Sequence, residues 1–537
     1  MDFFVVENFS EFKGEGIYLS LTYWDDWFQY QTKYIARYFR GPNESYPLGT
    51  VKIAENDMSR RSPNLPEHFE KLDDNFFSLG TDSMYYNEIL KLFPDEVVRN
   101  NIYKSLKDVA FDNLILEKVK NKLVFQNSLA RDIKYSTITE IFRKLAIGDS
   151  ITTTYSFKYI INEDSEIDTD EMEFKVNFSE TGLPTNVHAI VGRNGVGKSQ
   201  LLIDFLNSIN NSDENRLTFK DESNKKLIDP KEFFTKIISM NFSIFDNKKN
   251  EPRANYDTIG MSYIPIKHNT SLEKIYKEKF GEEYEEYGKY YDSRKEKLKF
   301  TNEKGKEVDP CNESNKWTAV FMDSLLTCFE NKPTLWGETL QILETDPVFK
   351  EHDCKGLYLN YTSQENADFM RQSYNFFSKL SSGHKIVMLS LTKIIELVDK
   401  KVLVIIDEPE LYLHPPLLSS YIRCLSELMT RRNGVVILAT HSPVILQEVP
   451  CSCIYKLSRK GETYYARRVK TNTFGESISI LMDEVFGLEA TESGFYNYIK
   501  KVSDSSDNLE YVMEKYASQL GTLGYDLLIT RMFNKKL

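Results

Sequence analysis

The chain has 537 residues, a formal net charge of −12, and 41% hydrophobic, 13% aromatic and 28% charged residues. This composition excludes a disordered or collagen-like chain, and a length above about 300 residues predicts several domains. The negative charge argues against wholesale wrapping of nucleic acid, although a local basic groove remains open. No apolar run approaches the ~18 residues of a membrane helix, and the acidic N-terminus is unlike a signal peptide. We therefore expect a cytoplasmic protein without a membrane partner.

The six cysteines are sparse and scattered, so we expect reduced thiols rather than a disulfide framework. Cys451 and Cys453 lie close together in the sequence. Two thiols alone cannot complete a tetrahedral metal site, so we expect no metal centre there.

Residues 1–145 form the first predicted unit. Alternation at 17–24, 32–39 and 49–54 predicts strands, and helical patterns follow to about Ile141. We find no recognisable chemistry in this unit and expect an accessory region.

Residues 146–260 are expected to form the first lobe of a nucleotide-binding domain. Predicted strands at 151–161 and 171–178 flank an acidic turn, and the apolar strand 187–191 runs into the loop GRNGVGKS. This loop fits the phosphate-binding pattern G-x-x-x-x-G-K-S between a strand and a helix. Its backbone N–H groups would wrap phosphates, Lys198 would bind the β- and γ-oxygens, and Ser199 would bind Mg²⁺.

We therefore expect ATP and Mg²⁺ as cofactors. The residues expected to contact them in this loop are Gly192, Arg193, Asn194, Gly195, Val196, Gly197, Lys198, Ser199 and Gln200.

Residues 261–368 contain a charged, tyrosine-rich stretch at 271–300 that lacks proline. The mixed charges predict solvated helices, and we expect a charged helical insertion that forms a surface lid. An arm that binds a partner or nucleic acid is the alternative.

Residues 369–477 are expected to form the second lobe. Ser381, Ser382 and Gly383 open a helix whose apolar residues recur at helical spacing. Free N–H groups and hydroxyls at a helix start can take an anion. Taken alone, the segment LSSGHK is an ordinary helix cap.

Two buried strands of this lobe end in polar residues. The run KVLVIIDEPE predicts a Walker B strand, in which Asp407 holds Mg²⁺ through its outer shell and Glu408 orients and deprotonates the attacking water. The run GVVILATHSP ends at His441, which can sense a phosphate, although an isolated histidine is more often a satisfied interior residue. A helical C-terminal tail is expected over 478–537.

In this order, the segments GRNGVGKS, LSSGHK, VLVIIDEPE and ATHSP resemble the ABC-type ATPase heads of SMC, Rad50, RecF and overcoming-lysogenization-defect (AAA15/AAA21-like) proteins. The resemblance implies an α/β fold, an ABC-type P-loop head with an accessory region, a helical insertion and a helical tail. It also implies ATP sites shared between two copies. Ser381, Ser382 and Gly383 of one copy would reach the γ-phosphate held by Lys198 of the other, with His441 as the switch histidine.

Transporter ATPases carry a serine-rich turn after Walker B, whereas DEPELYLHPP is similar to the branch found in bacterial anti-phage systems. Within that branch, the long N-terminal region, the run TGLPTNVHAIVGRNGVGK and the early stop resemble the Septu ATPase family, PtuA, including retron-associated forms. This resemblance implies an HNH nuclease subunit, PtuB, as partner, and in a retron a reverse transcriptase and its msDNA.

Two further expectations follow from this resemblance. The segment after His441 is too short for a Toprim nuclease and no nuclease motif is visible, so we expect no nuclease activity of the chain itself. The glutamine that these families carry between the lobes is missing from KIISMNFSIFD, so Asn241 or Ser243 would substitute and hydrolysis would be slow. The alternative function is an SMC/Rad50/RecF-like DNA-repair or DNA-clamping ATPase, but a tether of that kind needs sustained heptads, which we do not find.

Overall fold

A computed structural model describes residues 1–22, 29–56, 58, 60–131, 133–148, 154–161, 171–177, 183–210, 217–221, 226–228, 233–242, 260–265, 272–273, 291–292, 294–302, 305–312, 316–351, 357, 366–461, 463–486, 494–505 and 508–534. Within these ranges no helix is both long and apolar enough to cross a membrane. Cys311, Cys328, Cys424, Cys451 and Cys453 carry free thiols, and Cys354 lies outside the described ranges.

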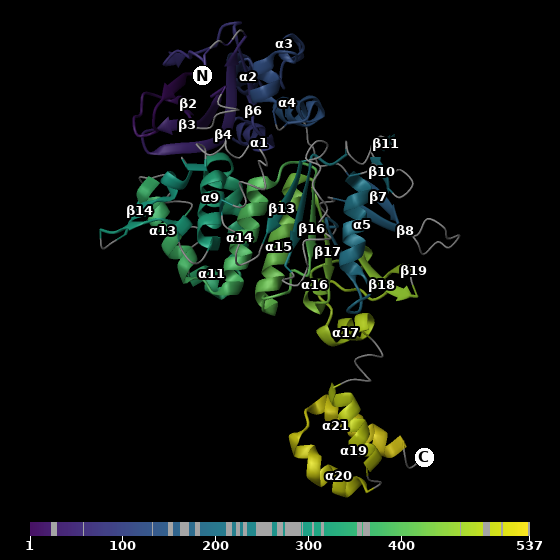
Figure 1. Ribbon diagram of the computed structural model, residues 1–537. Coiled ribbons are helices and arrows are strands. Elements are labelled where there is room, and N and C mark those ends of the chain that lie inside the picture. The colour runs from purple at the N-terminus through teal and green to yellow at the C-terminus, as the bar shows by residue number, and fades with distance from the viewer. Residues whose placement is uncertain are drawn as a thin grey trace.

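A seven-stranded sheet forms the centre of the molecule (Figure 1). Its strands, in spatial order, are β13 (Gly260–Pro265), β12 (Lys236–Asn241), β16 (Val402–Asp407), β17 (Val435–Thr440), β9 (Val187–Val191), β18 (Ile454–Lys460) and β19 (Thr463–Arg468). Neighbouring strands from β13 to β18 are parallel, and β19 closes the edge antiparallel to β18. Every residue of β9, β16 and β17 is buried, as expected for parallel strands that are covered on both faces.

Successive residues of β16 face two different hydrophobic cores. Leu403 and Ile405 pack with α5 (Lys198–Asn210), whereas Val404 and Ile406 pack with α14 (Ser382–Leu397) and α15 (Pro415–Arg432). A small antiparallel sheet joins the α5 side; its strands, in spatial order, are β11 (Lys226–Ile228), β10 (Leu217–Asp221), β7 (Tyr155–Ile160) and β8 (Glu171–Val176). Because successive side chains of a strand point to opposite faces, α5 and α14 lie on opposite sides of the sheet (Figure 1).

The expectation that residues 261–368 form a solvated lid is wrong for residues 316–351. Here α9 (Lys316–Asn331) and α10 (Pro333–Leu343) place Phe321, Leu325 and Trp336 at 0% exposure in the same core as α14. A short helix, α11 (Pro347–Glu351), follows. The charges that suggested solvation are concentrated upstream, and most of the stretch 271–300 lies outside the described residues.

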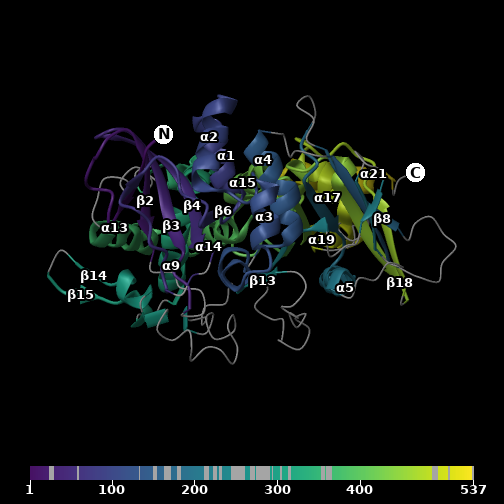
Figure 2. The ribbon, with the colours of Figure 1, turned by 90° about the horizontal axis from the view of Figure 1, so that it is seen from above.

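The N-terminal unit has a hydrophobic core of its own. Its six-stranded sheet contains, in spatial order, β5 (His68–Phe69), β1 (Phe3–Val6), β2 (Gly16–Leu21), β3 (Lys33–Gly41), β4 (Glu44–Glu55) and β6 (Phe76–Gly80). The helices beside this sheet are α1 (Ser83–Leu92), α2 (Glu96–Leu106), α3 (Asn113–Val119) and α4 (Arg143–Ile147). Strands β2, β3 and β4 lie where the alternation predicts them. Figure 2 shows the unit lying over α9 and α14.

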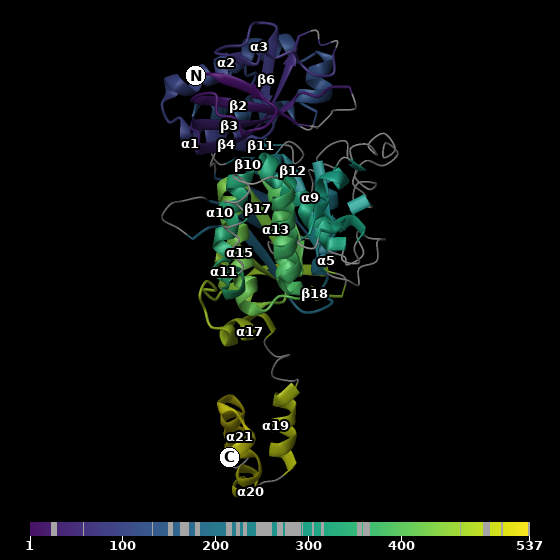
Figure 3. The same cartoon turned by 90° about the vertical axis from the view of Figure 1, so that its left-hand side faces the viewer.

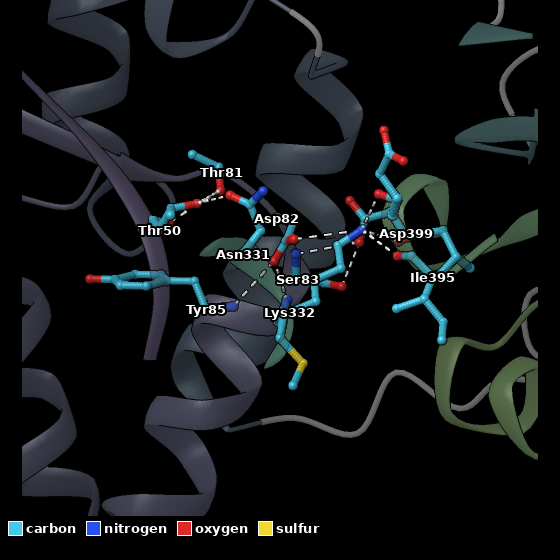
Figure 4. Close-up of polar contacts among 12 residues, drawn as sticks. Thr50, Thr81, Asp82, Ser83, Tyr85, Asn331, Lys332, Ile395 and Asp399 are labelled. Carbon is cyan, nitrogen blue, oxygen red and sulfur yellow. Dashed lines mark hydrogen bonds and ion pairs between the residues drawn. The ribbon is translucent and has the colours of Figure 1, made fainter. Parts of the chain in front are cut away.

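Polar contacts join the N-terminal unit to the end of α14 (Figure 4). Lys332 donates to backbone carbonyls at this helix end, and its Nζ lies 3.8 Å from Asp82 Oδ2. The accepting carbonyls are those of Ile395 (3.2 Å), Glu396 (2.9 Å) and Val398 (2.6 Å). Ser83 Oγ donates to Asp399 Oδ1 at 2.5 Å, in the link between α14 and β16. The accessory unit is therefore fastened to the segment that connects the predicted signature helix with the Walker B strand.

The chain ends in helices. A short helix, α16 (Pro443–Gln447), follows β17 and is contacted by α17 (Ile478–Phe486). Three further helices, α19 (Gly494–Ser505), α20 (Leu509–Tyr516) and α21 (Thr522–Asn534), share a small core of Ile499, Val502, Val512, Leu528 and Met532. Figure 3 shows these three helices beyond the end of the molecule opposite the N-terminal unit.

Candidate nucleotide-binding site

The loop between β9 and α5 has a backbone that requires glycine. Gly195 and Gly197 have φ angles of +76° and +100°, in the region that side chains other than glycine avoid. A Cβ on Gly197 would also stand 2.7 Å from the ring of Tyr464, and one on Gly192 would stand 2.6 Å from the carbonyl oxygen of Leu457. The loop is therefore held closely against β18 and β19, and its conformation depends on the absence of side chains.

Three strand ends bring the predicted residues to one edge of the sheet. Strands β9, β17 and β16 are parallel neighbours, with Val191 paired to Thr440 and Ala439 paired to Asp407. Carboxyl ends of neighbouring parallel strands share an edge, where ligands of open α/β sheets bind. The phosphate loop, Glu408 and His441 follow these three ends directly, so the sheet register places them together.

Lys198 contacts His441 directly. The side chain of Lys198 is buried, and its Nζ lies 2.6 Å from His441 Nε2, 3.3 Å from the Gly192 carbonyl oxygen and 3.4 Å from that of Arg193. Burial lowers the pKa of Lys198, while the charges of Glu408, Asp407 and Glu410 oppose this shift. The nearby acids thus favour the ammonium form in a site that would otherwise disfavour charge.

His441 lies between a cation and an anion. Its Nε2 is 3.4 Å from Glu408 Oε1 as well as 2.6 Å from Lys198 Nζ. Burial lowers the pKa of His441 and the Lys198 charge lowers it further, while Glu408 opposes both effects. The neutral imidazole is therefore favoured, with a ring nitrogen that accepts from the ammonium.

Glu408 has a strained backbone. Its φ of +50° lies in the left-handed region, which costs a residue with a side chain about 1–2 kcal/mol. Its N–H donates to the Ala439 carbonyl at 3.0 Å, and its own carbonyl accepts from Leu411 N at 3.2 Å. These contacts hold the turn in which the Glu408 carboxylate lies 3.4 Å from His441, which directly follows the neighbouring strand β17. Strain of this kind is concentrated at functional sites.

Glu410 is a site residue that the sequence analysis did not single out. Its Oε1 accepts from His441 N at 2.5 Å and from Thr440 Oγ1 at 2.8 Å, while burial raises its pKa. Its Oε2 is buried and has no hydrogen-bond partner within the described part of the chain. Glu410 thus holds the turn that presents His441. The only signal in the sequence was a third acid in the run DEPE.

The expected metal ligands lie on adjoining elements. Asp407 is buried at the end of β16, and its register partner on β12 is Asn241. Ser199 follows Lys198 at the start of α5. Hydroxyl and carboxylate oxygens are the ligands that Mg²⁺ prefers, and a buried carboxylate needs a compensating cation, so this donor set fits the ion. Of the two residues expected to replace the missing glutamine, Asn241 lies beside Asp407, and Ser243 lies outside the described residues.

The remaining predicted residues lie on the other face of the sheet. Ser381 precedes α14 in an extended conformation, and its Oγ lies 2.7 Å from His384 Nδ1. A Cβ on Gly383 would stand 2.8 Å from the carbonyl oxygen of Tyr412, so only glycine fits there. Within one chain the fold brings Lys198, Glu408 and His441 together but keeps Ser381, Ser382 and Gly383 apart from them, because α5 and α14 cover opposite faces (Figure 1).

A glycine loop between a parallel strand and a helix, beside an acidic strand end, defines a P-loop ATPase domain. A family comparison agrees with the ABC/AAA class of this domain: residues 331–447 match the model described as "AAA domain, putative AbiEii toxin, Type IV TA system". The matched stretch contains Ser381–Gly383, Asp407, Glu408 and His441.

Among individual proteins, the chain is similar to protein ea59 of Escherichia phage lambda. The two are 29% identical over 535 residues, which cover 95% of this chain and 94% of the phage protein.

The chain also has a distant likeness to solved structures. The ADP conformation of MJ1267, an ATP-binding cassette of an ABC transporter, covers 64% of this chain and 100% of its own, at 16% identity and a TM-score of 0.29. Stu0660 of Streptococcus thermophilus covers 71% of this chain and 93% of its own, at 12% identity and a TM-score of 0.24. Because both TM-scores are low, the fold of this chain is assigned from its own strand order and from the geometry of its phosphate loop.

Proposed function

We propose that this chain is the ATP-binding and ATP-hydrolysing subunit of a bacterial anti-phage defence complex, that it dimerises through shared ATP sites, and that it controls a separate HNH nuclease subunit. One observation carries the proposal of shared sites. Lys198, Glu408 and His441 meet at the carboxyl edge of the sheet, whereas Ser381 caps α14, which packs on the face of the sheet opposite to α5. One copy therefore carries the phosphate-binding half of one ATP site and the signature half of another.

Each residue has a role in this proposal. The backbone N–H groups of the loop bind the phosphates. When ATP binds, the Lys198 ammonium leaves His441 and contacts the β- and γ-oxygens of ATP instead. Asp407 and Ser199 would hold Mg²⁺, which would neutralise charge on the phosphates. Glu408 orients the attacking water and accepts its proton, and His441, released from the ammonium, donates toward the γ-phosphate. Ser381, Ser382 and Gly383 of the second copy close the site over the same phosphate.

Three observations support the defence role. The matched model is described as a putative AbiEii toxin of a type IV toxin–antitoxin system. The run DEPELYLHPP is similar to that of anti-phage ATPases, and the N-terminal region and phosphate loop resemble those of the Septu ATPase family, PtuA. The partner in this proposal is therefore an HNH protein of the PtuB kind, joined in a retron by a reverse transcriptase and its msDNA. Co-expression with the neighbouring genes and affinity purification tests this part, since a bound permease in place of a nuclease would contradict it.

Mixing two inactive variants tests the shared sites. Ser382→Arg places a bulky side chain where the partner's γ-phosphate belongs, and Lys198→Ala removes the phosphate ligand. In a heterodimer one site carries both changes and the other carries neither, so we expect partial recovery of ATPase activity on mixing. Absence of recovery, with heterodimers confirmed by mass measurement, would contradict independent shared sites.

A further inference from the structure

Asp346, His384 and His414 form a cluster at the start of α14 that the ATP chemistry does not use. One potential ligand atom from each lies within 4.8 Å of those from the other two. The side chains of Asp346 and His384 are 1% and 5% exposed, whereas His414 is exposed. The residues come from the turn before α11, the first turn of α14 and the turn before α15. Only the tertiary fold brings these segments together.

The Asp346 carboxylate has an unused buried oxygen. Its Oδ1 accepts from Val348 N at 2.9 Å and Phe349 N at 3.4 Å, and lies 3.3 Å from His384 Nε2. Its Oδ2 is buried and has no hydrogen-bond partner among the described residues. Leaving a buried acceptor unsatisfied costs about 1–3 kcal/mol, and more for a charged group. This oxygen therefore favours a cation or a proton beside it.

Both histidines can present a ring nitrogen to the same point. His384 Nδ1 lies 2.7 Å from Ser381 Oγ, so a proton on Nδ1 can be donated to that hydroxyl while Nε2 faces Asp346. Metal-bound histidines usually have their other ring nitrogen held in this way. His414 Nδ1 accepts from Leu417 N at 3.4 Å at the start of α15, which leaves Nε2 as its ligand nitrogen.

We propose that Asp346, His384 and His414 bind one divalent transition-metal ion, with zinc as the best match. Ligands of a tetrahedral zinc ion with bonds of about 2.0–2.1 Å lie about 3.4 Å apart, close to the 3.3 Å between His384 Nε2 and Asp346 Oδ1. The exposed His414 would close the remaining distance by rotating its side chain, which would give up the 3.4 Å hydrogen bond that its Nδ1 accepts from Leu417 N. Two imidazoles and one carboxylate suit zinc, whereas Mg²⁺ and Ca²⁺ prefer oxygen ligands. The exposed side leaves a fourth position for water.

The ion would join two segments that matter for the shared ATP site, and this consequence rests on the proposed function. His384 lies directly after Gly383, and His414 lies two residues after Tyr412, whose carbonyl oxygen packs against Gly383. Through His384 Nδ1 the ion would also orient the Ser381 hydroxyl. Zinc would thus hold the predicted signature residues in place before a second copy binds.

Metal binding by the full chain, without nucleotide, tests the site. Protein stripped with a chelator is dialysed against ZnCl2, CoCl2 or MgCl2, and bound metal is counted per chain. We expect one zinc per chain, cobalt absorption bands in the visible range, and no competition from Mg²⁺. His414→Asn should weaken zinc binding by about 100-fold or more, since it removes a ligand, while asparagine keeps the helix cap. Asp346→Asn should have the same effect.

Two controls separate this site from incidental zinc binding. His68 is an exposed histidine whose Nε2 lies 2.8 Å from Asp2 Oδ1, so His68→Gln removes a similar pair elsewhere and should leave the stoichiometry at one. Replacing Cys451 and Cys453 with serine should also change nothing. Equal zinc affinity in wild type and His414→Asn, or no zinc bound at about 100 µM, would overturn the proposal and leave a proton between His384 and Asp346. Because no nucleotide is present, this outcome does not depend on whether ATP sites are shared.

Discussion

Lys198 Nζ lies 2.6 Å from Nε2 of His441, across the gap between the phosphate loop and the end of β17. A buried ammonium and a neutral imidazole therefore satisfy each other, and the same two groups are those expected to contact the γ-phosphate. Binding of ATP would require this pair to separate.

Lys198→Ala should lower ATP affinity by roughly 100-fold or more, because it removes the main point charge on the β- and γ-phosphates. Isothermal titration with ATP and Mg²⁺ measures the effect. Lys175→Ala, at a lysine that is exposed on β8, is the matched control and should bind ATP normally. Undiminished affinity in Lys198→Ala would contradict the assigned role of the loop.

Glu408→Gln should keep ATP binding and slow hydrolysis by at least about 100-fold, because the amide cannot accept the proton of the attacking water. The trapped ATP should stabilise a dimer, which light scattering coupled to gel filtration would detect. Steady-state turnover equal to that of wild type would remove Glu408 from this role.

Glu410→Ala should lower the free energy of unfolding by about 1–3 kcal/mol, because it leaves His441 N and the Thr440 hydroxyl without their acceptor. Glu410→Gln keeps an acceptor oxygen and removes the buried charge. Since burial raises the pKa of Glu410, the charged form is disfavoured in the fold, so the glutamine variant should unfold no more easily than wild type at pH 7. Urea denaturation of both variants measures the difference, and equal losses would contradict the hydrogen-bonding role.

His441→Gln should change how stability depends on pH. The pKa of His441 is lowered in the fold from an unfolded value of 6.5, so the unfolded chain takes up a proton first as the pH falls. Its contribution to stability is present above pH 6.5 and declines below that value, through the folded pKa. Between pH 7.5 and 5, wild type should therefore lose more stability than His441→Gln, as measured by urea denaturation across that range. Parallel curves would contradict the shifted pKa.

The purified chain should not cleave DNA or RNA by itself, because its sequence shows no nuclease motif. A gel assay with Mg²⁺ and with Zn²⁺ measures this. Cleavage that survives stringent purification and disappears in His414→Asn would contradict the expectation and assign a catalytic role to the zinc cluster.

Local patterns in the sequence predicted the loop and the two strand ends that the fold brings to one edge of the sheet. The loop Gly192–Ser199 is one contiguous segment whose glycines are required by its own backbone, and both β16 and β17 are runs of buried residues that end at Asp407 and His441. Strands β2, β3 and β4 of the N-terminal unit were also predicted by alternation. The exchange of phosphate ligands and the assignment of Ser381–Gly383 to a second copy stay predictions.

Other features depend on contacts between segments that are far apart in the sequence. The charges at 271–300 suggested a solvated insertion, yet Trp336 belongs to the core because α9 and α10 pack on α14. Tyr464 lies against the phosphate loop only because β19 closes the sheet, and Asp346 meets His384 and His414 only because three turns converge. The sequence by itself determines local backbone conformation, because the interactions that set it are between residues close together along the chain. Which distant side chains meet is decided by how the helices cover the two faces of the sheet, and that arrangement exists only in the folded protein.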